Sequence, residues 1–355
     1  MYLRKKFLNK QIKLKQTDIQ RVTELLSTPK KVVIAVHYNP DGDAIGASLA
    51  LSLFLQSKGH RVSILSPNEL PDSLDWMPQV ETILIATQQI ERCKEEIHKA
   101  ELIFCLDFNS FERVGILRET FEQSKVLKIL IDHHRDPSHY FDIMYSVSEK
   151  TSSTCELMYH FLSHILKEKK SITKEMAECL YVGIIIDTGS LSYSCNNQST
   201  YRTLGELFRL GINGEKIHQL IYDNFSENRI RLLGFCLSER LVTLPDCAAS
   251  YIYLTKEDLV RFNYKQGDIE GIVNYGMSMK GIRFTAFFTE RDKRIRVSFR
   301  SKGDFDVNNF ARLYFSGGGH KNASGGNSYE NMENTINNFF ALVQKYKTEL
   351  TTPWE

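Results

Sequence analysis

Short apolar runs rich in β-branched residues alternate with longer helix-period segments in the first half of this 355-residue chain. Five of these runs are predicted strands: residues 31–36, 61–65, 82–86, 102–106 and 127–131. Runs that are apolar throughout, with helical segments between them, are typical of a parallel sheet buried on both faces. We therefore expect the first half of the chain to form an α/β domain.

The helices between these strands carry recognisable ends. Residues 44–58 are predicted to form the first crossover helix, and Gly59 suits the left-handed position after its last turn. A second helix is expected to begin at Ser153, because Ser153 and Glu156 have the spacing of a capping box. A third is expected from about Thr173, with Asp187 at its end.

The pattern changes after about residue 204. Residues 204–240 show helical periodicity with interspersed charges, and beyond them lie predicted strands at 250–255, 281–290 and 294–300. Helices are expected near 266–279, 306–314 and 329–347. Since a domain takes about 100 to 200 residues, we expect an N-terminal parallel-sheet domain over 1–205, a helical connector over 206–244 and a smaller mixed-sheet α/β domain over 245–350.

The charge balance excludes some classes of partner. There are 45 Lys and Arg residues against 43 Asp and Glu, which leaves a formal charge of +2. This is too balanced for a protein that wraps long duplex nucleic acid, so an anionic partner must be bound locally. The basic segment 1–16 lacks the apolar region of a secretory signal, and we interpret it as a solvated helix face in preference to a nucleic-acid-binding arm.

Cysteine usage and hydropathy predict the compartment. The chain has seven cysteines, an odd number, with no CxxC pair, so neither a disulfide framework nor a thiolate zinc site is indicated. No apolar run reaches the roughly 18 residues that a membrane span needs. We therefore expect a cytoplasmic protein that does not interact with membranes.

The first chemical signal is the segment HYNPDGDAIGAS, which follows the strand at 31–36. It places His37, Asp41 and Asp43 in one short loop. In an open α/β sheet, ligands bind outside the carboxyl ends of the strands, where these side chains would emerge. The alternative is that the loop is only a turn in which Asp43 caps the following helix.

Acids and histidines recur at other strand ends. Asp107 follows the run at 102–106, the segment Asp132-His133-His134 ends the run at 127–131, and Asp187 ends the run at 181–186. Several carboxylates gathered at one edge would repel one another unless cations compensate them. Carboxylate and imidazole donors without thiolates favour Mn²⁺, and they also suit Mg²⁺, Co²⁺ or Fe²⁺. The sequence therefore predicts a pair of divalent cations.

A glycine run stands near the C-terminus at residues 316–320, SGGGH. Consecutive glycines let backbone N–H groups approach an anion closely, and the histidine can donate a hydrogen bond to it. Arg300, at the end of a neighbouring predicted strand, can pair with a phosphate through its planar fork. These residues predict a phosphate-binding loop, although three glycines could equally form a flexible turn.

Taken together, these motifs resemble those of the DHH phosphoesterases. The likeness covers HYNPDGDAIGAS, the aspartate of LIFCLDFNSFERVG, IDHH and IDTGSLSYS, while VSFRS and SGGGHKNASGG resemble the DHHA1 domain. Within the family the chain is most similar to the short, two-domain oligoribonuclease and adenosine 3',5'-bisphosphate phosphatase type. It lacks the extra length of the RecJ exonucleases and the transmembrane segments of the membrane cyclic-dinucleotide phosphodiesterases. The GGGH element also distinguishes it from the family II inorganic pyrophosphatases.

The resemblance implies a role for each residue that matches a motif. His37 and Asp41 would bind one ion, Asp43, His133 and Asp187 would bind the second, and Asp107 would bridge both. Asp107 and His134 are the implied catalytic residues. His134 would lie beside the metals and contact the scissile phosphate, or alternatively orient a metal ligand through a hydrogen bond.

The implied phosphate contacts lie in the second domain. They are Arg300, Gly317, Gly318, Gly319 and His320. The family often has a further glycine where this chain has Ser316, which we leave out of the site. Arg113 matches a position that the family commonly fills with arginine, but an ion pair with Glu112 or Glu119 is an equal alternative. Tyr193 and Tyr314 could stack on a base, yet core packing is the commoner role, so we leave both out.

The resemblance thus implies an enzyme with its active site in the cleft between the two domains. It would hydrolyse short oligonucleotides, or remove the 3'-phosphate of adenosine 3',5'-bisphosphate, with two ions roughly 3.5 to 4 Å apart activating a water. Alternatives within the family are hydrolysis of pApA from cyclic di-AMP turnover, or of polyphosphate. A catalytically silent nucleotide-binding module is the alternative outside enzymes. Related proteins are often dimers, so a homodimer is also expected.

Overall fold

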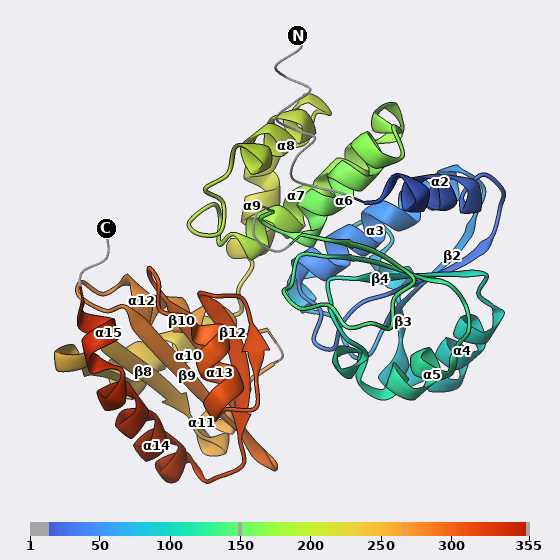
Figure 1. The fold of residues 1–355 in the computed structure, drawn as a ribbon. Coiled ribbons are helices and arrows are strands. Elements are labelled where there is room, and N and C mark those ends of the chain that lie inside the picture. The colour runs from blue at the N-terminus through green and yellow to red at the C-terminus, as the bar shows by residue number, and fades with distance from the viewer. Residues whose placement is uncertain (1–13, 148–150, 266, 353–355) are drawn as a thin grey trace. The chain divides into compact units, whose positions relative to one another are not determined.

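The chain folds into two compact units, Met1–Asn224 and Phe225–Glu355 (Figure 1). The computed structural model describes residues 14–147, 151–265 and 267–352. The basic segment 1–16, predicted to be a solvated helix face, lies outside the described residues except for its last three.

The first unit is built on a six-stranded sheet in which all neighbouring strands are parallel. Its order is β3-β2-β1-β4-β5-β6, and its strands are β1 (Lys31–Ala35), β2 (Arg61–Ser66), β3 (Leu84–Ile85), β4 (Leu102–Leu106), β5 (Lys128–Asp132) and β6 (Ile143–Ser146). The predicted parallel sheet is confirmed. The sequence pattern missed β6, because this edge strand has only four residues and exposes Met144.

Helices cover both faces of this sheet (Figure 1). Alternate side chains of β1 point to opposite faces, so that Val32 and Ile34 join one core cluster while Val33 and Ala35 join the other. The helices of the first unit are α2 (Gln16–Leu25), α3 (Gly42–Ser57), α4 (Ala86–Lys99), α5 (Arg118–Gln123), α6 (Thr154–His160), α7 (Lys174–Asp187), α8 (Gln198–Arg209) and α9 (Gly214–Tyr222). The π-helical turn Phe161–Ile165 continues α6, and 3-10 turns lie at Asp72–Leu74, Val80–Thr82, Phe111–Leu117 and Lys169–Ser171.

Most of the predicted helix ends agree with the structure. Gly59 has the left-handed φ of 86° after α3, and the Ser153 side chain caps α6 by accepting from the N–H of Glu156. The strand predicted at 82–86 is shorter than expected. Only Leu84–Ile85 pairs with β2, because Val80–Thr82 forms a 3-10 turn and α4 already begins at Ala86.

Close packing between helices sets the position of the predicted site residues in the first unit. A Cβ atom at Gly46 of α3 would lie 2.3 Å from the carbonyl oxygen of Cys179 in α7. A Cβ atom at Gly183 of α7 would lie 2.2 Å from Cys155 Sγ in α6. The three helices can therefore pack this closely only with glycine at both positions, which brings the end of α7 beside the start of α3.

The second unit contains a mixed sheet of order β11-β12-β10-β9-β8-β7. Its strands are β7 (Leu241–Leu244), β8 (Ala249–Leu254), β9 (Phe284–Arg291), β10 (Arg294–Ser301), β11 (Gly318–Gly319) and β12 (Ala323–Ser328). Only β8 and β9 run parallel. The predicted mixed sheet is confirmed, but β12 was missed because its sequence ASGGNS has no apolar alternation.

Two groups of helices pack against this second sheet. They are α10 (Glu227–Phe235), α11 (Lys256–Arg261) and α12 (Ile272–Ser278), and α13 (Val307–Tyr314), α14 (Met332–Lys345) and α15 (Lys347–Thr351). The π-helical turn Cys236–Arg240 and the 3-10 turn Pro245–Cys247 precede the central strands. The core on the α13 side is largely aromatic, with ring centroids 5.4 Å apart for Phe284 and Phe339 and for Phe299 and Phe310.

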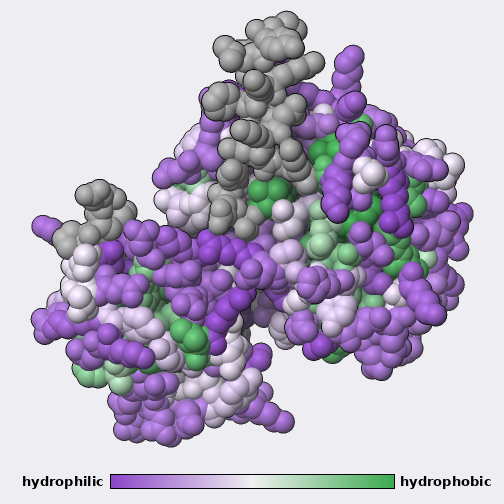
Figure 2. Space-filling view, in the orientation of Figure 1, coloured by the Kyte–Doolittle hydropathy of each residue, from purple (hydrophilic) through white to green (hydrophobic). Residues whose placement is uncertain are grey.

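The surface, the cysteines and the hydropathy of the helices can be compared with what the sequence predicts. The face shown in Figure 2 is mostly hydrophilic, with apolar side chains in small areas. All seven cysteines are buried, and none forms a disulfide. Within the part of the chain that the structure describes, no helix combines the length and the hydropathy needed to cross a membrane.

Candidate metal centre

The predicted ligands lie where the strand order of the first sheet reverses. The chain passes from β1 to β2 on one side, whereas β4 lies on the other side of β1. Such a switch point opens a crevice outside the carboxyl ends of the strands. His37 and Asp41 follow β1, and Asp107 follows β4, so the loops that carry them border this crevice.

Asp41 is the residue that caps α3. Its Oδ1 atom accepts hydrogen bonds from the N–H groups of Asp43 at 3.0 Å and Ala44 at 3.2 Å. Asp43, considered above as the alternative cap, instead lies inside the first turn of the helix. That alternative is therefore wrong, and Asp41 combines the capping role with a place in the group His37, Asp41 and Asp107, whose ligand atoms could hold a metal ion.

The carboxylate of Asp43 is fully buried and fixed by the start of α6. Its Oδ2 accepts from the N–H of Thr154 at 2.6 Å and its Oδ1 from the N–H of Cys155 at 2.8 Å. Burial raises the pKa of Asp43 well above its ordinary value, and the negative charges of Asp107 and Asp41 raise it further. A cation beside these carboxylates would offset both effects, because it favours the ionised form of Asp43.

Asp107 directs its two oxygens to different histidines. Its Oδ2 lies 3.3 Å from Nε2 of His37, and its Oδ1 lies 3.5 Å from Nε2 of His133. The residue is buried, at 2% exposure, and has a φ of 62°, a left-handed conformation that aspartate tolerates better than most residues. Burial raises the pKa of Asp107, but hydrogen bonding and positive charge from His37, His134 and His133, when these rings are protonated, outweigh it and hold this pKa well below the ordinary range.

His37 has one ring nitrogen ready for a cation. Its Nδ1 lies 3.0 Å from the carbonyl oxygen of Tyr38, which can only accept, so Nδ1 carries the proton. The buried Nε2 makes no hydrogen bond with any described residue, and its lone pair faces Asp107 Oδ2. Two lone pairs in this position repel each other, whereas a divalent cation would bind both. The residues present therefore fit a metal ion.

His133 brings three carboxylates together. Its Nε2 lies 3.4 Å from Asp187 Oδ2, 3.5 Å from Asp107 Oδ1 and 3.7 Å from Asp43 Oδ2. Burial lowers the pKa of His133 to about 4, with a further contribution from His134, so the ring is neutral and can donate a lone pair. The structure thus places all six predicted metal ligands at one edge of the sheet. Five of them form two groups that share Asp107, and Asp187 lies beside His133.

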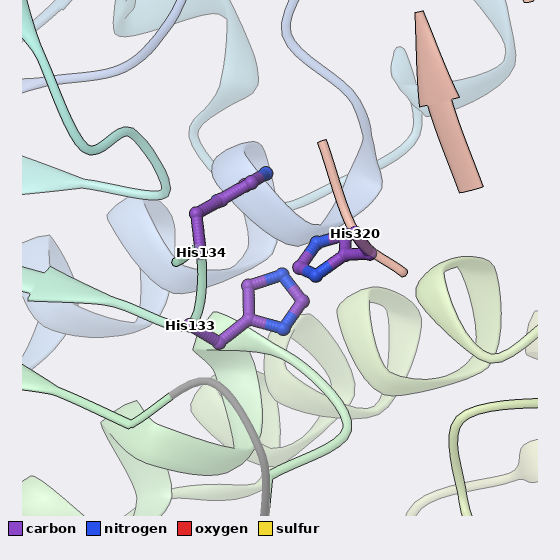
Figure 3. A group of neighbouring side chains, drawn as sticks. All are labelled: His133, His134 and His320. Carbon is purple, nitrogen blue, oxygen red and sulfur yellow. The ribbon is translucent and has the colours of Figure 1, made fainter. Parts of the chain in front are cut away.

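His134 is held between an acid and an arginine. Its Nδ1 lies 2.7 Å from Asp132 Oδ1, and its Nε2 lies 3.0 Å from Nη1 of Arg113, which can only donate. The ring is therefore neutral, with the proton on Nδ1. Burial and the charge of Arg113 lower the pKa of His134 to about 3, while burial and Asp107 raise the pKa of Asp132 to about 6. Figure 3 shows the rings of His133 and His134 just after β5.

Arg113 is therefore part of this edge. The sequence left open an ion pair with Glu112, but Glu112 lies 3.1 Å from Arg118 instead. The contact with His134 could not be read from the sequence, because 21 residues separate the two side chains along the chain.

The glycine run of the second unit is a paired segment and not a flexible turn. Gly318 pairs with Gly325 of β12, and a Cβ at Gly317 would lie 2.0 Å from the carbonyl oxygen of Gly325. The N–H of Gly319 already donates to Asn308 Oδ1 at 3.0 Å. A Cβ at Gly319 would likewise lie 2.7 Å from the carbonyl oxygen of Ala323, so Gly317 and Gly319 are required by the fold of the unit itself, which is a role that the sequence did not reveal.

The remaining predicted phosphate contacts flank this segment. His320, also drawn in Figure 3, lies in the turn between β11 and β12, where its N–H donates to the carbonyl of Ala323 at 2.7 Å. Arg300 lies near the end of β10 and is half-buried. Ser316 has a φ of 45°, the left-handed region in which glycine is unstrained, which explains why a glycine suits this position.

The two tyrosines left out of the site have structural contacts. The hydroxyl of Tyr314 lies 3.1 Å from that of Tyr346, and its ring packs on Phe310. Tyr193 packs over Gly189, where a Cβ would come within 2.3 Å of the tyrosine ring. Core and loop packing accounts for both residues.

Sequence reasoning missed Thr154. Its hydroxyl donates to Asp107 Oδ1 at 2.8 Å, in addition to the bond from its N–H to Asp43. The only signal in the sequence is the small polar run at 151–154, and all four of its residues are buried. Buried polar groups are usually hydrogen-bonded, and Thr154 has its acceptors in segments that are distant in the sequence.

The chain is also similar to known proteins in sequence and in fold. The chain matches the models for the DHH family, N-terminal domain, over residues 31–184 and for the DHHA1 domain over residues 247–349. The crystal structure of an exopolyphosphatase-related protein from Bacteroides fragilis is 39% identical, with a TM-score of 0.89, and the match covers 95% of this chain and 98% of that one.

Two relatives with curated names are also similar over most of their length. One is the bifunctional oligoribonuclease and PAP phosphatase NrnA of Bacillus subtilis, 27% identical over 88% of this chain and 93% of the relative. The other is the probable bifunctional oligoribonuclease and PAP phosphatase NrnA of Streptococcus mutans, 27% identical over 85% of this chain and 91% of the relative.

Proposed function

The chain belongs to the DHH family of phosphoesterases and carries its DHHA1 domain, and on this premise we propose that it hydrolyses short oligoribonucleotides to mononucleotides. We also propose that it removes the 3'-phosphate of adenosine 3',5'-bisphosphate. The relatives named for both activities, which match over most of their length, support this choice of substrates.

One observation carries the proposal. The two oxygens of Asp107 face different ligand groups, His37 at 3.3 Å from Oδ2 and His133 at 3.5 Å from Oδ1. A carboxylate that presents one oxygen to each of two groups is the arrangement that bridges two ions in hydrolytic centres. Asp107 is therefore the residue whose side chain is hardest to replace.

Manganese is the cation that we propose. The ligand set consists of imidazole and carboxylate donors, which suits Mn²⁺ better than softer ions and also accommodates Mg²⁺, Co²⁺ or Fe²⁺. When bound, the two cations would lower the pKa of a water molecule and neutralise charge on the phosphate oxygens. His37 and Asp41 would hold one ion, and Asp43, His133 and Asp187 the other, with Asp107 shared.

The neighbouring side chains would orient the phosphate. Asp132 keeps the proton of His134 on Nδ1, so that Nε2 can accept from Arg113. This fixes the guanidinium of Arg113, whose remaining N–H groups can donate to a phosphate oxygen as charge-assisted hydrogen bonds. We propose that His134 acts by orienting Arg113 and not as a general acid, because its Nε2 faces a guanidinium that can only donate and therefore carries no proton to give.

The second unit would bind another phosphate of the substrate. We propose Arg300 and His320 for this role, together with the segment 317–319. Such a contact would favour short, multiply phosphorylated substrates over long polymers. Cytoplasmic location remains our proposal, supported by seven free, buried cysteines. The homodimer expected from the resemblance remains a prediction.

Polyphosphate is the second candidate substrate. It is favoured by the name of the structural relative, which calls that protein exopolyphosphatase-related. Because polyphosphate has no base or sugar, its hydrolysis would need only the metal centre and the phosphate contacts. The dinucleotide pApA is a further candidate substrate, of the same chemical class as the oligoribonucleotides.

A substrate panel tests the proposal. Mn²⁺-dependent turnover would be measured on a 5'-phosphorylated diribonucleotide, pApA, adenosine 3',5'-bisphosphate and polyphosphate. We expect hydrolysis of the nucleotides and a loss of about a thousandfold or more in Asp107→Asn. Asp142→Asn is the matched control, because its carboxylate bonds to the N–H of Lys128 at the opposite end of β5.

Two outcomes would contradict the assignment. Full Mn²⁺-dependent turnover in folded Asp107→Asn would exclude the bridging role. Unchanged dinucleotide hydrolysis in His320→Ala would exclude the phosphate contact proposed for the second unit, while leaving the metal centre intact.

A further inference from the structure

The start of α6 connects two carboxylates that belong to different loops. Thr154 is the first residue of this helix and is fully buried. Its N–H donates to Asp43 Oδ2 at 2.6 Å, and its hydroxyl donates to Asp107 Oδ1 at 2.8 Å. One residue thus holds an acid from the first turn of α3 and an acid from the end of β4.

The hydroxyl bond determines how Asp107 is turned. The terminal torsion of an aspartate is broad, so the carboxylate can rotate unless a donor fixes it. With Thr154 on Oδ1, that oxygen faces His133 at 3.5 Å, and Oδ2 is left to face His37 at 3.3 Å. Without this donor, the assignment of one oxygen to each ligand group would depend on the histidines alone.

The side chain of Thr154 is itself well fixed. Threonine is branched at Cβ, which restricts its χ1 rotation, and this residue has no exposed surface. The helix start is anchored by Ser153, whose hydroxyl accepts from the N–H of Glu156 at 3.0 Å. The N–H of Cys155 donates to the other oxygen of Asp43 at 2.8 Å, so both oxygens of that acid are oriented by α6.

We propose that Thr154 is a positioning residue of the metal centre. By holding Asp43 and Asp107 together, it sets which oxygen each carboxylate presents to the cations. Residues that hydrogen-bond to metal ligands without binding the metal typically change metal affinity by about 10- to 100-fold when they are removed. The inference rests on the proposed function only for its kinetic test, because metal binding can be measured without a substrate.

Titration of the metal-free protein with Mn²⁺ by calorimetry tests the inference. Thr154→Val keeps the shape of the side chain and the N–H groups of residues 154 and 155 that donate to Asp43. It removes only the hydroxyl, so we expect Mn²⁺ affinity to fall by about 10- to 100-fold. Thr154→Ser keeps a hydroxyl, and we expect its affinity to stay within about threefold of the wild type on the same scale. Rescue by serine separates positioning from packing.

Thr200→Val is the matched control. Thr200 is also fully buried at the start of a helix in the first unit, and its hydroxyl donates to a carboxylate, Glu156 Oε2, at 2.7 Å. The substitution removes the same kind of bond, but its acceptor is not one of the predicted metal ligands. We expect a comparable loss of thermal stability but unchanged Mn²⁺ affinity.

The kinetic test follows Mn²⁺ dependence. In Thr154→Val, the Mn²⁺ concentration for half-maximal turnover should rise, while KM for the diribonucleotide at saturating Mn²⁺ changes little. If Thr154→Val does not fold, Thr154→Ala compared with Thr154→Ser provides the same contrast.

Wild-type Mn²⁺ affinity in folded Thr154→Val would overturn the inference, and so would an equal loss of affinity in Thr200→Val. A wild-type protein that binds Mn²⁺ but hydrolyses no substrate of the panel would contradict the proposed function. The inference would then still stand or fall by calorimetry alone.

Discussion

The predicted binding sites of the two units differ in the chemical groups that form them. In the first unit, the site consists of ionisable side chains at the carboxyl edge of a parallel sheet, and Asp43, Asp107 and His133 are all buried. In the second unit, the corresponding segment consists of glycine backbone paired within a mixed sheet, above a core of phenylalanine rings.

This difference determines what each unit needs in order to be stable. Buried carboxylates that raise one another's pKa are costly until cations compensate them, as for Asp43 beside Asp107 and Asp41. Glycines with paired backbone groups need no such compensation, since their polar atoms are already hydrogen-bonded. We therefore expect metal to stabilise the first unit and to leave the second unchanged.

Metal removal is the strongest test of this comparison. Each ion stabilises the fold by about 4 kcal/mol when its concentration exceeds Kd a thousandfold. Hydrogen exchange measured with Mn²⁺ and then with a chelator should show lost protection in β1, β4 and β5. An equal loss of protection in β9 and β10 would show that metal stabilises both units and not the first alone.

Phe299→Ala should affect the second unit alone. The ring is buried and lies 5.4 Å from that of Phe310, so its removal should lower the free energy of unfolding of this unit by about 3 to 5 kcal/mol. Mn²⁺ affinity should not change. Phe340→Ala is the control, because this ring is 45% exposed and its loss should cost far less. Weaker Mn²⁺ binding in Phe299→Ala would contradict the view that metal binding depends on the first unit alone.

Glu156→Gln tests a buried carboxylate of the first unit that is not one of the predicted metal ligands. Burial would raise the pKa of Glu156, but hydrogen bonds from His160, Ser199 and Ser152 outweigh it and lower this pKa to about 2. Since this is below the ordinary value of 4.5, its stabilisation is complete above pH 4.5 and is lost as the pH falls toward 2.

The lowering of this pKa from 4.5 to about 2 corresponds to about 3 kcal/mol. The unfolding temperature of the metal-free protein should therefore fall more steeply between pH 5 and pH 2 in the wild type than in Glu156→Gln. The same pH dependence of the unfolding temperature in both proteins would contradict the assignment, whereas the expected difference would show that neighbouring side chains can stabilise a buried acid without a metal ion.

Gly325→Ala should have the smallest effect. A Cβ at this position would meet only the carbonyl oxygen of Val297, at an ordinary contact distance of 3.5 Å. The free energy of unfolding should change by less than about 1 kcal/mol. Gly317→Ala is the matched contrast, because its Cβ would lie 2.0 Å from a backbone oxygen. Equal effects of the two substitutions would argue against the paired geometry of this segment.

The sequence predicted those parts of the molecule that depend on local pattern. Apolar runs gave the parallel sheet, and acids at the ends of these runs indicated one edge, because parallel strands bring their carboxyl ends together. It could not predict contacts that depend on packing between distant segments. Thr154 lies 47 residues from Asp107 and 111 from Asp43, and nothing in the local sequence links them.

The same limit applies to the second unit. Arg300 and His320 were identified as residues, but β12 was not identified as a strand, because its register is imposed by β10. In the structure, Arg300 pairs with Ala323 and Gly318 pairs with Gly325. The segment predicted to be a phosphate-binding loop therefore contains the edge strand β11. Glycine-rich strands have little intrinsic signal, since their pairing partners supply the order.

The burial of all seven cysteines has a practical consequence for spectroscopy. Burial raises the pKa of Cys93 to about 11 and that of Cys236 to about 12, so these thiols are almost entirely protonated at neutral pH and react slowly with alkylating reagents. A cysteine introduced at an exposed position in each unit would therefore be labelled selectively with a fluorophore or a spin label. The native thiols could stay in place, and the distance between two such labels could be followed in solution while a nucleotide binds.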